Sequence, residues 1–456
     1  MTIGSEQKRN REKSVVPDDT TPLLPSKHDE CRPSQEQRQA SLAGAVFNLS
    51  TTIVGAGIMA LPATMRVLGL IPGIIMIIFI ALLTNASIEI LIRFSRAAHK
   101  TTYAGAMGDA FGKIGRRVLQ TLVVINNVGL MIVYLIIIGD VISGTSASGD
   151  HHFGLLEAWF GVHWWTSRAF VLLVVTLAVL APLTSFKRID SLRITSAVSV
   201  ALAVVFVVIT AGIAIYKLSN GSIAMPKLFP HLTNSASIWK LFTAVPVIVT
   251  AYVCHYNVQI IDNELHHSSQ IHQVVGLSIV LCSAVYITTS FFAFLLFGES
   301  TLEDVLSNFD SDIGIPYGYV LNNIVRVSYV VHIMLVFPMI FFALRLNLDG
   351  LLFHKASPLA SDNRRFVGIT APLLAVLYLC ACFVPSIWDA FQITGATATV
   401  CIGFIFPASI VLKDPHGVAT RRDRILSVFM MVLAVASSAV AIYSDIHSAF
   451  DKAKEG

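Results

Sequence analysis

The stretch from Asn48 to Pro62, NLSTTIVGAGIMALP, places polar side chains and two glycines inside a segment that is otherwise apolar. At bilayer depth, a backbone can leave N–H and C=O groups unpaired only where it is buried in protein or lines a cavity. A helix that breaks at these glycines offers the amides of Ala56, Gly57 and Ile58 at the start of its second half. Such amides, with the positive end of the helix dipole, suit a carboxylate, whereas the carbonyls that end the first half suit an ammonium or another cation. An α-amino acid presents both groups.

The alternative is that the glycines serve only packing, because small residues let two helices approach closely. Packing alone does not require the polar residues Asn48, Ser50 and Thr51 just before the glycines. We therefore predict that the break binds a substrate. The residues predicted to bind there are Thr52, Gly55, Ala56, Gly57 and Ile58.

Further polar residues at a similar depth can complete a pocket. They are Asn126 and Asn127 in the third predicted span, Thr250 and Tyr252 in the sixth, His332 in the eighth, and Thr394, Thr397 and Thr399 in the tenth. A single threonine often donates to a carbonyl of its own helix, so each one alone also has a structural explanation. Two adjacent asparagines are harder to explain in that way.

Two histidines, His332 and His255, lie deep inside predicted spans, where no Asp or Glu lies equally deep. Imidazole titrates near pH 6.5, at about the pH where a proton-coupled process operates, so both are candidates for coupling to a proton. The alternative is a neutral histidine that forms hydrogen bonds between helices, and the sequence leaves both open. The cysteines and histidines do not form a recognisable metal-binding pattern, and we expect neither a metal nor a cofactor.

The composition is that of a multi-pass membrane protein. Hydrophobic residues make up 55% of the 456 positions, charged residues 13%, and the mean hydropathy is +0.71. Segments of about 20 apolar residues, each long enough to cross a bilayer, recur eleven times. Their approximate bounds are 41–67, 70–94, 116–142, 168–186, 194–216, 238–261, 272–297, 317–347, 366–384, 387–411 and 425–445. No nucleophile motif or phosphate-binding loop is present in the sequence, so an enzyme is not expected.

The basic residues predict the orientation of the chain in the bilayer. Most of the 32 Lys and Arg residues fall in residues 1–40 and in every second connection between spans, which the positive-inside rule assigns to the cytosol. We expect residues 1–40 to form a disordered cytosolic tail, residues 41–447 the transmembrane domain, and residues 448–456 a short lumenal tail. This placement accounts for the basic residues without a nucleic-acid partner.

The positions of two irregular spans indicate a duplicated architecture. The first span contains the glycine break, and the sixth contains Pro246 followed by a polar run that ends at Asn257. Interrupted helices at equivalent places in two five-helix halves are typical of inverted-repeat transporters. We therefore predict an all-α integral membrane protein of eleven transmembrane helices, with a 5+5 inverted repeat and one accessory helix.

These segments resemble a known family. The stretch from Gly44 to Pro62, GAVFNLSTTIVGAGIMALP, is similar to the first helix of the amino acid/auxin permeases. Cys254–His255 through Asn263–Glu264–Leu265, and the helix from Val325 to Arg345 with its internal Phe337–Pro338, extend the likeness to about residues 40–447. The chain most resembles the plant vacuolar amino-acid transporters, which are similar to sodium-coupled neutral amino-acid transporters.

The resemblance implies a LeuT-like fold and secondary active transport of amino acids across the vacuolar membrane. Sodium-using relatives carry an asparagine at the position of Thr51, and hydroxyl residues at the positions of Met334 and Val336. Because sodium prefers hard oxygen ligands, these differences favour a coupling proton over sodium. An acidic dileucine pattern at residues 19–24, DTTPLL, resembles vacuolar sorting signals. An acidic vacuole then favours export to the cytosol. An amino-acid sensor with little transport and a sodium-coupled carrier are the alternatives.

Overall fold

The computed structural model describes residues 40–145, 152–230, 235–310, 313–353, 356–383 and 395–455. Contacts divide the chain into residues 1–32 and residues 33–456, and every described residue belongs to the second unit. This unit is helical, as predicted for an all-α protein, apart from a two-residue antiparallel pairing of β1 (Gly144–Thr145) with β2 (His152–Phe153), in the register Gly144 to Phe153. A single bridge also joins Ala40 to Leu265.

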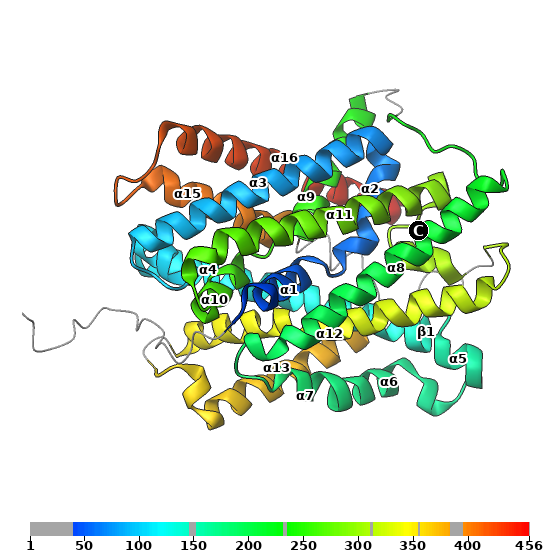
Figure 1. Ribbon diagram of the computed structural model, residues 1–456, viewed down its shortest axis with the longest axis horizontal. Helices are drawn as coiled ribbons and strands as arrows, with labels where there is room; N and C mark the ends of the chain where they lie inside the picture. The colour runs from blue at the N-terminus through cyan, green and yellow to red at the C-terminus, as the bar shows by residue number, and fades with distance from the viewer. Residues whose placement is uncertain are drawn as a thin grey trace, which may run out of the picture. The chain divides into compact units, whose positions relative to one another are not determined.

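Helices occupy every predicted span of the first half of the chain (Figure 1). They are α1 (Leu42–Ile53), α2 (Gly57–Leu68), α3 (Leu70–Ala97), α4 (Tyr103–Ser143), α6 (Arg168–Val175) continued by the π-helix η3 (Thr176–Leu180) and α7 (Ala181–Thr184), and α8 (Arg193–Ser219). Two short helices, α5 (Leu155–Phe160) and η2 (Trp164–Thr166), precede α6, and η4 (Asp190–Leu192) precedes α8.

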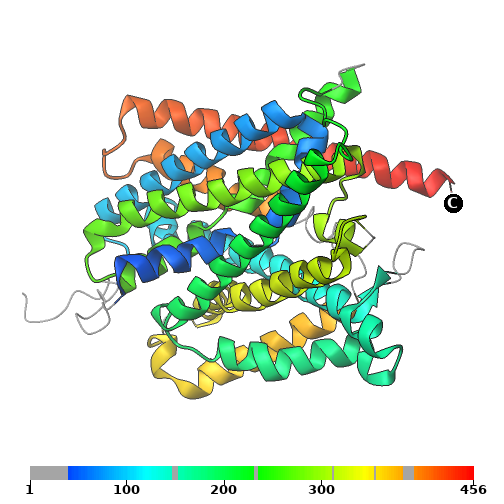
Figure 2. The same ribbon diagram turned by 45° about the vertical axis from the view of Figure 1, so that its right-hand side comes forward.

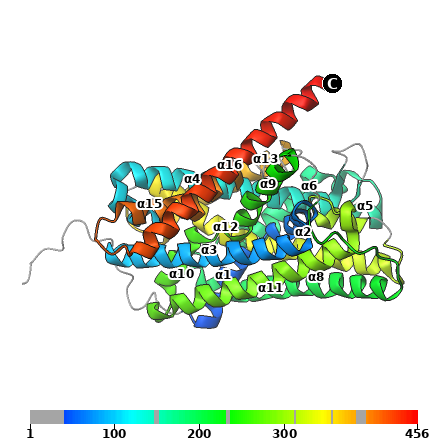
Figure 3. The same cartoon turned by 90° about the horizontal axis from the view of Figure 1, so that it is seen from above.

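The second half repeats this order. Its helices are α9 (Ser235–Tyr252), α10 (His255–Glu264), α11 (Ile271–Phe297), α12 (Gly318–Leu352), α13 (Asn363–Phe383), the π-helices η9 (Gly395–Thr399) and η10 (Cys401–Ile405) leading into α15 (Phe406–Lys413), and α16 (Arg421–Glu455). The 3-10 turns η5 (Ser268–Gln270), η6 (Gly298–Ser300), η7 (Val305–Asp310) and η8 (Leu359–Ser361) lie in connections. The end of α16 projects beyond the other helices (Figure 3).

Eight of the described helices are long and apolar enough to cross a membrane, and the bent pair α1 and α2 makes a ninth. The helical segments Arg168–Thr184 and Thr397–Lys413 are apolar but shorter. Within the residues that the structure describes, each predicted span therefore coincides with helical structure, while the number of eleven crossings stays a prediction.

The first predicted break is present. Ser41 caps the start of α1 by accepting a hydrogen bond from the amide of Gly44. Helix α1 ends where Val54 adopts an extended backbone, and α2 resumes at Gly57 after a bend of 54°. The second break follows Tyr252, where Val253 and Cys254 leave the helix before α10 begins. Both interruptions fall where the sequence predicted them.

The two broken helices run antiparallel to each other. Helix α1 contacts α10, and α2 contacts α9, so the corresponding halves meet on either side of the breaks. The dark-blue α1 lies beside the longer helices α8 and α11 (Figure 2). Around them, α12 packs against α4 and α8, and α11 packs against α1, α2 and α8. One continuous set of buried apolar side chains fills the space between these helices. The breaks therefore lie inside the bundle.

One end of the bundle collects the connections predicted to be cytosolic. The carboxylate of Glu264 accepts hydrogen bonds from the amides of Ile189 (3.0 Å) and Asp190 (2.6 Å). Asn48 donates to the Ile189 carbonyl at 3.2 Å, and Ala40 donates to the Glu264 carbonyl at 2.9 Å. The start of α1, the end of α10 and the turn before α8 are thus joined at this end.

Candidate functional site

The break between α1 and α2 is buried, with backbone groups left free. Every residue from Val54 to Ile58 is buried. The amides of Ile58 and Met59 donate to the carbonyls of Gly55 (3.3 Å) and Ala56 (3.1 Å). Within the described part of the chain, no acceptor is recorded for the amides of Gly55 and Gly57. The backbone of Ala56 is hydrogen-bonded with the Tyr134 hydroxyl of α4. Two buried amides therefore remain available to an anionic group.

The glycines also permit close packing, as the alternative interpretation held. A Cβ atom on Gly55 would lie 2.1 Å from the hydroxyl oxygen of Tyr134. A Cβ atom on Gly57 would lie 2.6 Å from the Cβ of Ala251 in α9. Real Cβ atoms do not approach other atoms so closely, so both positions require glycine for steric reasons. Close packing and unpaired backbone amides at the break are therefore compatible properties of the same residues.

Tyr286 of α11 joins the two breaks. Its hydroxyl lies 2.6 Å from the carbonyl oxygen of Ile53, at the end of α1, and 2.8 Å from that of Ala251, near the end of α9. A phenol carries one hydrogen, so the two carbonyls share a single donor. Next to it, the Tyr252 hydroxyl lies 2.8 Å from the Ser283 hydroxyl, and the rings of Tyr252 and Tyr286 meet edge to face at 5.2 Å. Carbonyl oxygens at both helix ends therefore retain capacity for a cationic group.

Thr52 takes part in a contact between three helices. Its hydroxyl donates to the Asn48 carbonyl of its own helix at 3.0 Å and accepts from the side-chain amide of Asn257 at 3.0 Å. Asn257, in the first turn of α10, also donates to the Met339 carbonyl of α12 at 3.2 Å. Thr52 is therefore partly explained by a bond within α1, while Asn257 links α1, α10 and α12.

The two asparagines of α4 extend this contact towards the tenth span. Asn127 donates to the Ile340 carbonyl at 3.4 Å, and Asn126 donates to the Asn127 side chain at 3.0 Å. The hydroxyl of Thr399 in η9 donates to Asn126 at 2.6 Å. Because Met339 and Ile340 are adjacent, a chain of buried polar contacts runs from α1 through α10, α12 and α4 to η9. We call the side chains of Thr52, Asn257, Asn127, Asn126 and Thr399 the polar layer.

The structure separates the remaining predicted residues. Asn127 precedes Tyr134 by seven residues, or about 10 Å along α4, so the asparagines do not lie at the free amides. The Thr250 hydroxyl donates to the Pro246 carbonyl of its own helix at 2.8 Å, which supports the structural explanation for this residue. Thr397 is exposed, and Thr394 lies outside the described residues.

The two candidate histidines occupy different surroundings. Nδ1 of His332 lies 2.8 Å from the Ser199 carbonyl oxygen and 2.9 Å from the Ser199 hydroxyl of α8. Nε2 of His255 lies 3.1 Å from the Ser87 hydroxyl of α3, which itself donates to the Gly403 carbonyl at 2.5 Å. His255 is thus a hydrogen-bonded link between helices, as the structural alternative described. His332 contacts the backbone of Val54, the residue at which α1 ends at the first break.

Residues at the positions compared with sodium-using relatives offer few cation ligands. The Thr51 hydroxyl donates to the Ser196 carbonyl of α8 at 3.0 Å, and Met334 and Val336 are apolar. Among the residues that the structure describes, no three His, Cys, Asp or Glu side chains gather closely enough to hold a metal ion.

Sequence reasoning missed three residues at the breaks, namely Tyr134, Tyr286 and Asn257. Asn257 belonged to the polar run that marks the second break, so a signal for it was present. The two tyrosines lie in apolar stretches of α4 and α11, and their roles depend on contacts with residues far away in the sequence.

A bundle with two antiparallel broken helices, free backbone groups at the breaks and carbonyls facing them is the architecture of a multi-pass membrane transporter. The chain belongs to the family described as transmembrane amino acid transporter protein, which matches residues 38–448. It is 60% identical over 435 residues to amino acid transporter AVT6A from Arabidopsis thaliana, covering 95% of each chain. It is 26% identical over 402 residues to sodium-coupled neutral amino acid symporter 2 from Danio rerio, covering 82% of this chain and 75% of that one.

Solved structures confirm the predicted LeuT-like fold. A mutant manganese transporter from Eremococcus coleocola matches with a TM-score of 0.58 at 11% identity, covering 92% of this chain and 88% of that one. MhsT in complex with L-phenylalanine matches with a TM-score of 0.57 at 13% identity, covering 89% of this chain and 99% of that one. The family and the fold are those of transporters and not of enzymes, as predicted.

Proposed function

We propose that this protein carries amino acids across the vacuolar membrane and that proton flow drives their export from the lumen to the cytosol. The observation that carries the proposal is the pair of buried, unpaired amides at Gly55 and Gly57 beside the carbonyls of Ile53 and Ala251. An α-amino acid places its carboxylate on the amides and its ammonium group against the carbonyls. Family membership and the relatives named for amino acid transport support this substrate class.

The polar layer gives the proposed site a boundary on the side of α1 and α10. Its hydrogen bonds connect five helical segments, so an opening to that side has to separate some of them. Tyr134 and Tyr286 flank the proposed site through their hydroxyl groups, which contact the backbone at each break. Side-chain selectivity then depends on what surrounds the substrate beyond its shared zwitterionic group.

The residues near the first break support a proton, and not sodium, as the coupling ion. Thr51 already donates its hydroxyl hydrogen to α8, and Met334 and Val336 carry no oxygen, so a hard oxygen cage for sodium lacks these contributors. A buried histidine, His332, lies beside the same break. The named sodium coupling of the Danio rerio relative keeps a sodium-coupled carrier as the second candidate.

Transport by purified protein in liposomes tests the proposal. We expect a labelled neutral amino acid to move faster under an imposed pH gradient, and a protonophore to remove that acceleration. Equal flux with the gradient collapsed and sodium supplied contradicts proton coupling and favours the sodium-coupled candidate. Competition by each of the other amino acids against the labelled one then defines the substrate range.

A sensor that binds amino acids with little transport is separated by removing residues 1–38. A carrier keeps its flux without this tail, because the site lies within the helices. Loss of a cellular amino-acid response with unchanged flux indicates signalling through the tail. The vacuolar location is tested by replacing Leu23 and Leu24 with alanine, which we expect to shift the protein to other membranes.

A further inference from the structure

The hydrogen bonds of His332 leave one of its ring nitrogens unpaired. The side chain is fully buried, and Nδ1 lies 2.8 Å from the carbonyl oxygen of Ser199. A carbonyl oxygen can only accept, so the neutral ring donates to Ser199 when its single hydrogen is on Nδ1, whereas the Ser199 hydroxyl, 2.9 Å away, can donate to Nδ1 in the other tautomer. With the hydrogen on Nδ1, the other nitrogen, Nε2, is a bare acceptor, and it has no hydrogen-bond partner in the described part of the molecule.

The backbone of Val54 also lies within hydrogen-bonding reach of the His332 ring. Val54 is the residue at which α1 ends, so its carbonyl group lies at the first break. A neutral imidazole carries one hydrogen, so it can donate to the Ser199 carbonyl or to the Val54 carbonyl, but not to both at once. A protonated imidazole donates from both nitrogens and can bind two carbonyls at once.

We infer that His332 is the proton-binding residue of the transporter, and that its protonation ties the end of α1 at Val54 to α8 at Ser199. The inference rests on the proposed proton-driven function and names the group through which the proton acts. Protonated His332 then bridges two backbone carbonyls, as a bound metal cation would. It does so at a break where the side chains that could bind a hard cation are missing.

Contacts around His332 explain why a tie at this point matters. Helix α1 is already joined to α8 through the hydrogen bond from Thr51 to the Ser196 carbonyl. Ser196 and Ser199 are one turn apart on α8, so the bond from protonated His332 forms the next contact along the same interface. Of these two contacts between α1 and α8, it lies nearer in the sequence to the free amides of Gly55 and Gly57. Protonation therefore fixes the segment on which the proposed carboxylate site depends.

Few other ionisable groups face the ring. Tyr329 stacks on it at 5.8 Å from the preceding turn of α12, and Tyr329 in turn has Tyr134 of α4, Tyr286 of α11 and Asp304 as electrostatic neighbours. Helix α1 contains no ionisable side chain, and those of α8 lie near its ends, at Arg193, Tyr216 and Lys217. The phenols stay neutral near neutral pH, so the charge next to this break changes on His332.

The test compares His332→Gln with His272→Gln in liposomes. Glutamine can still donate to the Ser199 carbonyl, but it cannot take up a proton. We expect uptake driven by a pH gradient to fall about tenfold or more, the size of a lost charge-assisted hydrogen bond. Exchange of labelled for unlabelled amino acid at equal pH should continue and become independent of pH. His272 is exposed at the start of α11, and its variant should behave as the unchanged protein does.

Each outcome distinguishes the inference from the function on which it rests. Retained pH dependence in His332→Gln overturns the inference and leaves proton coupling intact. Absence of any response to a pH gradient in the unchanged protein contradicts the proposed coupling itself.

A measurement on the unchanged protein covers the case in which the variant does not fold. Hydrogen exchange is followed at about pH 4 and about pH 7.5, with intrinsic rates corrected. We expect peptides spanning residues 48–58 to be more protected at the lower pH, and peptides of α13 to be unaffected. Equal protection of residues 48–58 at both values overturns the inference.

Discussion

At the scale of single residues, Gly55 shows how steric and chemical demands meet at the break. The Tyr134 hydroxyl occupies the space that a side chain at position 55 needs, and the same hydroxyl is bonded to the backbone of the next residue. Gly55 thus lets α4 approach the unwound segment closely enough for Tyr134 to hold it. Replacing the tyrosine and the glycine separately and together tests this arrangement.

We expect Gly55→Ala to reduce amino-acid uptake more than tenfold. The added methyl group meets the Tyr134 oxygen at 2.1 Å, and overpacking of this kind costs about 1–3 kcal/mol. The double variant Gly55→Ala, Tyr134→Phe should recover part of the uptake, because the nearest remaining atom is a ring carbon at 3.1 Å. Uptake is measured in liposomes at matched protein levels.

The control is Tyr134→Phe alone, which shows what the hydroxyl contributes without a clash. Recovery in the double variant identifies steric conflict as the cause of the loss. If the double variant is no more active than Gly55→Ala, the clash with Tyr134 is not the cause.

The sequence predicted the polar residues of the breaks better than it predicted their partners. Thr52, Asn126 and Asn127 join the same polar layer because buried amides and hydroxyls need partners in the bundle. Which carbonyl each one reaches depends on helix rotation, which spacing along the chain does not specify. Tyr134 and Tyr286 lie in apolar runs, where a tyrosine is equally common as a core residue. Their roles could be seen only once α4 and α11 were placed beside the breaks.

At the scale of elements, α4 consists of two helical segments that meet at Gly112. Helix α4 contains a non-helical residue at Gly112, with φ of 67°, so residues 103–111 and 113–143 are separate helical segments. A Cβ atom there would meet nothing within 4 Å. The cost of a side chain at this position is therefore conformational and not steric.

We predict that Gly112→Ala destabilises the protein by about 1–2 kcal/mol, because a left-handed backbone strains any residue with a Cβ. Gly368, which lies inside α13 with equally open space, provides the matched control. Gly368→Ala should be neutral or more stable by up to about 1 kcal/mol, since alanine favours a helix over glycine. Thermal unfolding in detergent measures both variants. A larger loss for Gly368→Ala contradicts the explanation.

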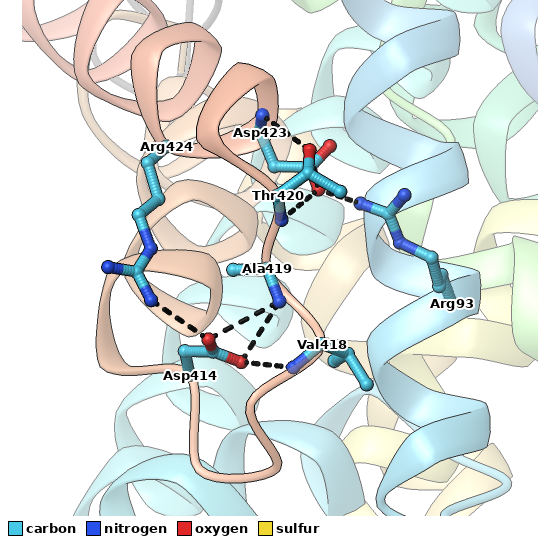
Figure 4. A network of polar contacts seen from close by, with 7 residues as sticks. All are labelled: Arg93, Asp414, Val418, Ala419, Thr420, Asp423 and Arg424. Carbon is cyan, nitrogen blue, oxygen red and sulfur yellow. Dashed lines mark hydrogen bonds and ion pairs between the residues drawn. The ribbon is translucent and has the colours of Figure 1, made fainter.

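The connection between α15 and α16 is held by two carboxylates, Asp414 and Asp423 (Figure 4). Asp414 accepts from the amides of Val418 and Ala419 and pairs with Arg424 at 3.1 Å. Asp423 pairs with Arg93 of α3 at 2.7 Å. Desolvation raises the pKa of Asp414, but the hydrogen bonds from Val418 and Ala419 and the Arg424 pair outweigh it, so its pKa lies below the ordinary value.

A lowered pKa in the folded state means that the Asp414 charge stabilises the fold above the ordinary carboxyl value of about 3.9. This contribution is lost as the pH falls through the lower folded value. We predict that Asp414→Asn lowers the melting temperature by a few degrees near neutral pH and that the difference from the unchanged protein disappears in strong acid. Asparagine tolerates the left-handed backbone of this residue, so the variant isolates the charge.

Thermal unfolding at a series of pH values measures the difference. The control is Glu89→Gln, which removes an exposed carboxylate on α3. A difference for Asp414→Asn that grows towards acid pH contradicts the assigned sign.

The elements themselves were predicted well because hydropathy reports burial in lipid directly. In the described parts of the chain, the eleven predicted spans coincide with helical structure, and both breaks lie where glycine, proline and polar residues interrupt the apolar pattern. The π-helical turns η3, η9 and η10 were not predicted. A π-turn changes one residue of register within an apolar run, and such a shift leaves no mark in composition.

At the scale of the whole molecule, α3 extends from the loops at one end of the helical bundle to the loops at the other end. Its first residues, Leu70 and Ile71, donate to the carbonyls of Lys227 and Leu228. Near its other end, Arg96 donates to the Ser268 carbonyl at 2.8 Å. A helix of 28 residues is about 40 Å long, which matches a bilayer with its headgroups. The loops on α3's two ends therefore belong to opposite sides of the membrane.

This arrangement agrees with the alternation of basic residues. Arg93 and Arg96 lie at the same end of α3 as the loop after α15, and Asp109 of α4 contacts His416 of that loop at 2.7 Å. The positive-inside rule places this end in the cytosol. The structure gives the pairing of loops by side, and the charge pattern supplies the prediction of which side is cytosolic.

Cysteine labelling in sealed vacuoles tests that prediction. Single cysteines replace Lys113, at the α4 end predicted to be cytosolic, and Met225, an exposed residue of the loop beside the start of α3. Cys31 in the tail is changed to serine in both, and this background protein reports labelling of the remaining cysteines. We expect a membrane-impermeant maleimide to reach Lys113→Cys from outside and Met225→Cys only after the membrane is opened. The reverse pattern places the tail in the lumen. The orientation of the site in the membrane is then opposite to the one predicted from the basic residues. Labelling of both positions from one side contradicts the assignment of α3's two ends to opposite sides.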